Sequence, residues 1–311
     1  MKIINNPNRK DWSTILERPT QTVDDIEETV NQVFDEVKLK GDEAIKKYTS
    51  YFDGVSLVSN SVSKEEIDSA SEFISDDLKR AINKAKENIE RFHKAQKTNK
   101  IEVETSKGVL CWQEKRAIQS VGLYIPGGTA PLFSTVLMLA VPAQIAGCKE
   151  IILCSPPNKE GKIASEILYT AKLCGVTKIM TVGGIQAIAG LTFGTATIPK
   201  VHKIFGPGNQ FVTVAKQIAT KYGVAIDMPA GPSELLIVAD KHANPAYIAS
   251  DLLSQAEHGI DSQVILVSTS KEMIASVSKE IEKQIQILPR HAIAEKAIDN
   301  SKMIYVENDT I

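Results

Sequence analysis

The chain has 311 residues, with 36 lysine and arginine residues against 38 aspartate and glutamate residues, and its formal net charge is −2. This near-neutral balance excludes a nucleic-acid-binding protein that relies on a strongly basic surface. Hydrophobic residues make up 43% and charged residues 24% of the chain, which is typical of soluble globular proteins rather than disordered or fibrous ones. At about 150 residues per domain, this length predicts two domains.

The hydropathy of the sequence indicates neither a secretory signal nor a membrane-spanning segment. Residues 1–12 contain no apolar stretch of the kind that a secretory signal needs, so we expect a cytoplasmic protein. The longest apolar run, 136–146, is far shorter than the roughly 20 residues that cross a bilayer. The cysteines form no CxxC pair, which favours reduced thiols on or near buried elements over a metal or redox site. They are Cys111, Cys148, Cys154 and Cys174.

The first hundred residues, taken in chain order, show helical patterns. A capping-box-like start at Thr22 precedes apolar residues at helical spacing, and this pattern ends at Gly41. A second helix follows with its apolar side at 44–48, and a long amphipathic helix is expected from Leu78 onward. We therefore expect residues 1–118 to form a helical N-terminal region that packs on an α/β core.

From Gln119 onward, short apolar runs alternate with helical patterns. The expected strands are 120–125, 150–154, 178–182, 203–205, 235–239, 263–267 and 303–306. The helical patterns between them include 163–173, 210–221, 245–257 and 271–286. Such alternation predicts right-handed crossovers and parallel sheets, with a ligand at the carboxyl ends of the strands.

Four of the loops that follow these strands are rich in glycine and proline. They are 125–129, 183–186, 206–210 and 228–234. Glycine allows close approach of the backbone to a ligand, and proline stiffens the turn. Four such loops favour a site for a nucleotide-like or polar metabolite over simple turn chemistry.

The dinucleotide-binding fingerprint GxGxxG is incomplete in this chain. Gly206 and Gly208 supply the first two glycines, but Phe211 occupies the third position. A bulky side chain there is expected to block close packing of helix on strand. The local pattern alone therefore disfavours NAD, and any such cofactor would bind in a non-standard way.

A candidate metal site lies at the end of a predicted helix. Gln255 and His258 are three residues apart, so both could face one ion. Imidazole suits Zn²⁺, whereas a glutamine oxygen is a rarer ligand. On spacing alone, a capping role of His258 beside Gly259 is favoured over metal ligation. Ser233 lies outside a GxSxG elbow and is interpreted as a hydrogen-bond donor to a substrate or, alternatively, as a cap.

Five blocks of the sequence resemble histidinol dehydrogenases and occur in that family's order. They are VGLYIPGGTAPLFSTVLM (121–138), VGGIQA (182–187), KIFGPGN (203–209), DMPAGPSE (227–234) and QAEHGIDSQ (255–263). The resemblance implies an α/β fold of two incomplete Rossmann-like units with parallel sheets, preceded by the helical N-terminal region. Residues 119–228 would form the first unit, and 229–311 the start of the second.

The resemblance also implies the function. Histidinol dehydrogenases are zinc-dependent homodimers that oxidise L-histidinol to L-histidine with two NAD⁺, through bound histidinal, in the last two steps of histidine biosynthesis. Neither nucleic acid nor a membrane is expected as a partner. The residues that match the family's motifs are Tyr124, Gln186 and Asn209 for NAD, Ser233 for the substrate, and Gln255 and His258 for both zinc and substrate.

The sequence departs from the family at its end. The family continues well past the position of Ile311, with an acid/base Glu-His pair in a Pro-Glu-His stretch and two further zinc ligands, an aspartate and a histidine. This sequence contains no Pro-Glu-His stretch. We therefore expect a C-terminally truncated histidinol dehydrogenase that holds no catalytic acid/base residue and has little or no activity alone.

Two alternatives to this enzyme stay open. The first is a non-catalytic α/β protein that binds metabolites or acts as a scaffold. The second, less favoured, is an unrelated alcohol or aldehyde dehydrogenase, and none of the four cysteine contexts indicates the nucleophile that the aldehyde enzyme would need.

Overall fold

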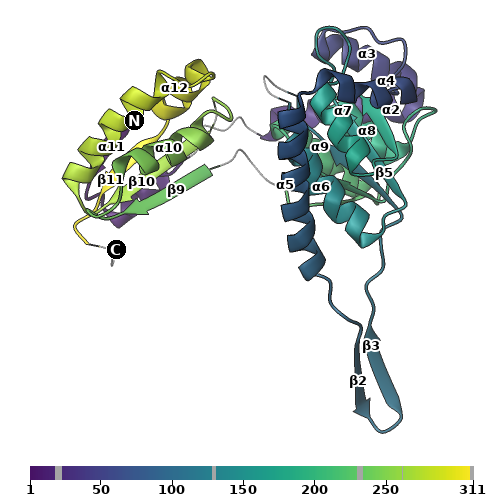
Figure 1. Ribbon diagram of the computed structural model, residues 1–311, viewed down its shortest axis with the longest axis horizontal. Helices are drawn as coiled ribbons and strands as arrows, with labels where there is room; N and C mark the ends of the chain where they lie inside the picture. Colours follow the sequence, from purple (N-terminus) through teal and green to yellow (C-terminus); the bar gives the residue numbers. More distant parts are fainter. Residues whose placement is uncertain (18–22, 128–130, 230–233, 261, 309–311) are drawn as a thin grey trace. The chain divides into compact units, whose positions relative to one another are not determined.

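The computed structural model describes residues 1–17, 23–127, 131–229, 234–260 and 262–308. They form two compact units, the smaller made of Met1–Thr22 with Ala230–Ile311 and the larger of Val23–Pro229. Each unit has its own sheet and its own helices (Figure 1). None of the described helices is both long and apolar enough to cross a membrane.

Five parallel strands form the main sheet of the larger unit, in the order β6-β5-β4-β7-β8. The strands are β4 (Ser120–Tyr124), β5 (Glu150–Ser155), β6 (Lys178–Thr181), β7 (Lys203–Phe205) and β8 (Ala225–Ile226). The chain adds strands in one direction from β4 to β6, and then returns to the other side of β4 for β7 and β8. This reversal is the strand order of a Rossmann fold, and its switch point lies between β4 and β7.

Helices cover both faces of this sheet. Successive strand residues point to opposite faces, so they enter two different cores. Val121 and Leu123 of β4 belong to one core, whereas Tyr124 belongs to the other. The first core includes residues of α5 (Asp76–Ala95), α6 (Phe133–Ala146) and α7 (Ser165–Leu173). The second includes residues of α2 (Val23–Lys40), α3 (Asp42–Asp53), α8 (Gly184–Phe193) and α9 (Gln210–Lys221). The short α4 (Lys64–Ser69) and η2 (Ala70–Phe73) precede α5.

A two-stranded hairpin extends from the larger unit. It consists of β2 (Ile101–Ser106) and β3 (Val109–Gln113), and every residue of both strands is exposed. In Figure 1 this hairpin projects away from the helices and the sheet of its unit.

The smaller unit contains a four-stranded parallel sheet in the order β1-β11-β10-β9. Its strands are β1 (Lys2–Asn5), β9 (Glu234–Ala239), β10 (Gln263–Ser268) and β11 (Lys302–Tyr305). Three helices pack on it, and they share one core with it: α10 (Pro245–Ala256), α11 (Lys271–Ile285) and α12 (His291–Asp299). The short η1 (Arg9–Asp11) and α1 (Trp12–Ile15) follow β1.

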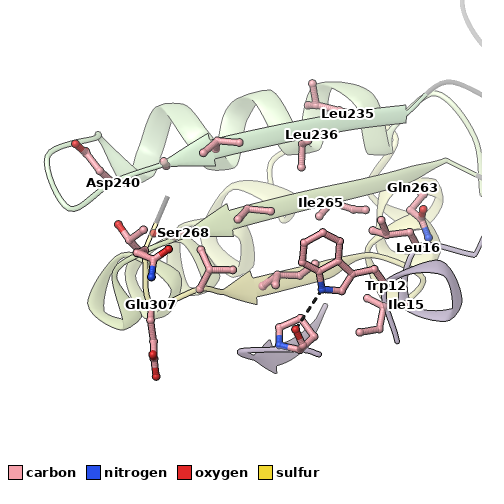
Figure 2. A pocket seen from close by; sticks show the side chains of 18 of the residues that line it. Trp12, Ile15, Leu16, Leu235, Leu236, Asp240, Gln263, Ile265, Ser268 and Glu307 are labelled. Carbon is pink, nitrogen blue, oxygen red and sulfur yellow. Dashed lines mark hydrogen bonds between the residues drawn. The ribbon is translucent and has the colours of Figure 1, made fainter. Parts of the chain in front are cut away.

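The opposite face of the smaller unit's sheet is also apolar but open. Leu235 and Ile237 of β9 pack in the core, whereas Leu236 and Val238 between them are 61% and 72% exposed. This face is the floor of a hollow of about 1020 Å³. Figure 2 shows Trp12 beside Ile265 over this face. Parallel sheets usually have both faces covered, so it is unusual that the described residues leave this apolar face open.

The sequence patterns locate the strands and helices of the α/β part well. Each expected strand is present with both ends within one residue of the expected position, and each named helix with both ends within two. The N-terminal region is mostly helical as expected, but it also contains β1 and the hairpin. The expected N-terminal region is also divided between the two units, since residues 1–22 belong to the smaller unit and Val23 begins the larger one. The reason is a distant pairing, because Ile3 lies opposite Met303 in the sheet.

Candidate functional site

The carboxyl ends of β4 and β7 mark the candidate site of the larger unit. These strands are neighbours, with Leu123 opposite Phe205, so Tyr124 and Gly206 follow side by side. In open α/β sheets, ligands bind outside the carboxyl ends of the strands, at the point where the strand order reverses. The topology therefore selects the loops after these two strands.

Tyr124 connects the end of β4 to the start of α8. Its side chain is 4% exposed, and its phenol oxygen accepts a hydrogen bond from the Gly184 N–H at 3.1 Å. Burial raises the pKa of Tyr124 to about 12, and the nearby Asp53 carboxyl adds to this shift. The phenol is therefore protonated at neutral pH and can also donate a hydrogen bond.

Gln186, on the first turn of α8, is fully buried beside an aspartate that no motif indicated. Its Nε2 donates a hydrogen bond to Asp53 Oδ2 at 3.3 Å, and its Oε1 is buried without a partner among the described residues. Burial raises the pKa of the Asp53 carboxyl to about 6. In the sequence, Asp53 precedes Gly54 and looks like an ordinary helix end, so only the fold shows its place near the site.

Asn209 is the N-cap of α9. Its Oδ1 accepts a hydrogen bond from the Val212 N–H at 3.1 Å, while much of the residue is exposed. The first-turn N–H groups of α9 therefore begin at the switch point. Such a helix start favours a negatively charged group, for example a phosphate.

The glycines of these loops allow the loops to pack on one another. Gly206 has a φ of +131°, and a Cβ added there would lie 2.1 Å from the Tyr124 carbonyl oxygen. A Cβ added at Gly127 or at Gly183 would lie 2.4 Å from the ring of Pro156. Close approach between loops thus explains these glycines, where the sequence suggested close approach to a ligand.

The obstruction expected from Phe211 does not occur. Its side chain is 37% exposed, so it does not separate the helix from the sheet. Gly208, just before α9, instead packs on that helix's own first turn, where an added Cβ would lie 2.4 Å from a Val212 methyl group. The incomplete fingerprint is therefore compatible with a Rossmann-like loop and helix.

Gln255 and His258 lie at the end of α10 in the smaller unit. The helix ends at Ala256, and the His258 N–H donates to the Gln255 carbonyl at 3.2 Å. His258 therefore lies beyond the helix, so the argument that both side chains share one helical face does not apply. Gln255 is half-buried, and its Nε2 has no partner within the part of the chain that the structure describes, whereas His258 is exposed.

The described residues do not by themselves form a metal site. They contain no group of three or more His, Cys, Asp and Glu side chains that could hold an ion. The amide oxygen of Gln255 and the imidazole of His258 supply two donors of suitable chemistry. Ser233, the residue expected to hold the substrate, lies outside the described residues.

Burial makes three of the four cysteine thiols harder to ionise. Burial raises the pKa of Cys154 to about 12 and that of Cys174 to about 11, so both thiols are protonated at neutral pH. Burial also raises the pKa of Cys148. Cys111 is exposed on the hairpin, contrary to the expectation of thiols near buried elements.

The hollow of the smaller unit has an apolar floor and is not lined by the described residues that were predicted to form the site. Its floor is formed by apolar side chains, including Leu236 and Ile265, and acidic residues such as Asp240 and Glu307 lie at its rim (Figure 2). None of the described residues assigned to NAD, zinc or substrate lines it. Its shape alone therefore gives no reason to assign the reaction to it.

Comparison with known proteins agrees with the strand order and the motifs. A sequence model of the family described as histidinol dehydrogenase matches residues 16–310. The chain is 53% identical over 308 residues to a histidinol dehydrogenase of Bacteroides thetaiotaomicron, covering 99% of this chain and 72% of that protein. It is 54% identical over 297 residues to the Escherichia coli K12 enzyme, covering 94% of this chain and 68% of that protein.

A solved structure is similar over the same range. The crystal structure of histidinol dehydrogenase from Elizabethkingia anophelis superimposes with a TM-score of 0.94 at 52% sequence identity. The superposition covers 99% of this chain and 71% of that one.

Proposed function

Since this chain belongs to the histidinol dehydrogenase family, we propose that its protein oxidises L-histidinol to L-histidine with NAD⁺, through bound histidinal, in histidine biosynthesis. The observation that supports this most directly is the close match in sequence and in fold along nearly the whole chain. The buried, protonated thiols of Cys154 and Cys174 argue against either as the nucleophile of an unrelated aldehyde dehydrogenase.

The switch point of the larger unit supports NAD as the cofactor. Tyr124 ends β4 and Asn209 follows the adjacent β7, and Tyr124 is hydrogen-bonded to the first residue of the helix that carries Gln186. The start of α9 offers N–H groups to a pyrophosphate. When bound, NAD⁺ accepts the hydride that leaves the carbon atom of the substrate.

We assign zinc to the end of α10. The Gln255 amide oxygen and a His258 ring nitrogen would bind the ion, with further donors from outside the described residues, since zinc sites usually have four ligands. When bound, zinc orients the imidazole and amine of histidinol, a templating role. Ser233 would hold the substrate by a hydrogen bond.

The chain's own residues would bind and orient the reactants. Tyr124 keeps its proton and fixes the loop before α8, and Asn209 fixes the first turn of α9. Gln186 is buried on the first turn of α8 and hydrogen-bonds to Asp53, so it would act on the cofactor by holding the start of that helix against the end of α3. The resemblance assigns proton transfer to a Glu-His pair in a Pro-Glu-His stretch, and we assign that step to no described residue.

The test is the reaction itself, in the full-length protein with zinc. We expect NADH to form from L-histidinol and NAD⁺, with two NADH for each L-histidine, as two successive hydride transfers require. Zinc-dependent binding of L-histidinol in a calorimeter would separate the enzyme from a scaffold. A zinc-loaded, folded protein that forms no NADH would overturn the proposal.

The resemblance further implies a homodimer, and the composition of residues 1–12 predicts a cytoplasmic protein. Both stay predictions. Light scattering of the full-length protein measures the first, and fractionation of cells measures the second.

A further inference from the structure

A buried ion pair lies beneath the loop after β7, between Lys216, which lies outside the motif blocks, and Asp227, which begins the block 227–234. The Lys216 ammonium on α9 pairs with the carboxylate of Asp227, which directly follows β8. The Lys216 side chain is only 6% exposed, and that of Asp227 is 29% exposed. The pair is therefore largely shielded from water. Removal of one partner from such a pair leaves the other as an uncompensated buried charge.

Both members of the pair also bind Gly206. Lys216 Nζ donates a hydrogen bond to the Gly206 carbonyl at 2.7 Å, and Asp227 Oδ2 accepts one from the Gly206 N–H at 2.8 Å. The Asp227 N–H in turn donates to the Ile204 carbonyl at 3.2 Å, which holds the aspartate in register with β7. Opposite charges thus fix both backbone polar groups of one glycine.

The position of this glycine determines where the candidate site begins. Gly206 starts the turn of residues 206–208 that leads to Asn209, the N-cap of α9. Its backbone also lies against the Tyr124 carbonyl, with no space for a Cβ. The ion pair therefore fixes the turn relative to both Tyr124 and the start of α9.

Stability alone does not account for such a pair. A buried ion pair contributes little net stability compared with apolar side chains of similar volume, because both charges must leave water. Its contacts here are directed at a single loop residue. Holding that residue in one place is the role to which the geometry points.

We infer that Lys216 and Asp227 are positioning residues for NAD, which act by holding the Gly206–Asn209 turn in its binding conformation. The inference rests on the proposed NAD-linked function. Neither side chain needs to touch the cofactor, since both act through the backbone of Gly206.

The test compares Lys216→Met with Lys221→Met in the full-length protein. Lys221 lies on the same helix and pairs with Glu27, but its side chain is 63% exposed. We expect Lys216→Met to weaken NAD⁺ binding about tenfold in a calorimeter, as loss of a charge-assisted hydrogen bond predicts, and Lys221→Met to leave it unchanged. The KM for NAD⁺ should rise in parallel, while the KM for L-histidinol stays within twofold of wild type.

A second measurement needs no cofactor. Hydrogen–deuterium exchange of residues 203–209 without NAD⁺ should be faster in Lys216→Met than in wild type and unchanged in Lys221→Met. If circular dichroism shows Lys216→Met to be unfolded, Asp227→Asn takes its place, because it removes the charge and keeps an oxygen for the Gly206 N–H. In that variant we expect a more than threefold loss of NAD⁺ affinity.

The outcomes separate this inference from the proposed function. A folded variant with unchanged NAD⁺ affinity, or with equal rises in both KM values, would overturn the positioning role alone. A wild-type protein that binds no NAD⁺ would overturn the inference and the proposed function together. A wild-type protein that binds NAD⁺ but oxidises no histidinol would count against the proposed function only.

Discussion

The phenol oxygen of Tyr124 accepts a hydrogen bond from the Gly184 N–H, 3.1 Å away, and so joins the end of β4 to the start of α8. Two of the three residues assigned to NAD, Tyr124 and Gln186, therefore belong to one connected structure. Asp53 extends it, because its carboxylate accepts a hydrogen bond from Gln186. Variants of these residues test the site one contact at a time.

Tyr124→Phe removes only the phenol oxygen from this structure. The part-buried Gly184 N–H then loses its acceptor, at a cost of about 1 kcal/mol, which corresponds to roughly a fivefold weaker binding of NAD⁺ if the loop is part of the site. Titration calorimetry measures the affinity. The control is Tyr247→Phe, whose side chain is 72% exposed in the smaller unit, and an equal loss in both variants would contradict the prediction.

Gly206→Ala tests the contact between the two loops at the switch point. The new Cβ would lie 2.1 Å from the Tyr124 carbonyl oxygen, in addition to the strain at φ +131°. Gly223→Ala isolates the strain, since Gly223 has φ +81° and nothing within 4 Å of an added Cβ. From urea unfolding we expect a loss of about 1–2 kcal/mol for Gly223→Ala and about 3 kcal/mol or more for Gly206→Ala. Similar losses would show that the loops do not pack closely.

Asp53 should make stability depend on pH. Its pKa is about 6 in the folded protein and near 3.8 when exposed, so the folded state binds the proton more tightly. Its contribution is therefore most favourable below about pH 3.8 and is lost as the pH rises through 6. Asp53→Asn cannot ionise, and we expect its stability relative to wild type to increase over this range in urea unfolding. A difference that is constant with pH would show that the carboxyl is not desolvated.

His258→Ala tests the assignment of zinc. Loss of an outer-shell partner already costs 10- to 100-fold in metal affinity, so loss of a direct ligand should cost more than about 100-fold. Metal analysis after dialysis should show a variant nearly free of zinc, and histidinol oxidation should fall with it. His242→Ala, an exposed histidine of the same unit, should keep its zinc. Full zinc content in His258→Ala would remove this residue from the site.

Neighbouring residues largely determine the helices and strands of this protein. Alternation and helical periodicity located β4 and α9 to within one residue, since both depend only on which side chains are buried along a few turns or a few strand positions. The glycine- and proline-rich loops were also evident from the sequence, and the motif blocks indicated the family. The role of those glycines was not evident, because Pro156, which fills the space beside Gly127 and Gly183, belongs to neither of their loops.

Only the tertiary structure decided which distant segments meet. It pairs Ile3 with Met303, places Asp53 against Gln186 across 133 positions, and closes the Lys216–Asp227 pair around Gly206. Strand order and register are set by the burial of whole faces of a sheet, which no local window of sequence contains. The residue types at the site could thus be predicted from the sequence, whereas the contacts that hold them in place come from the fold.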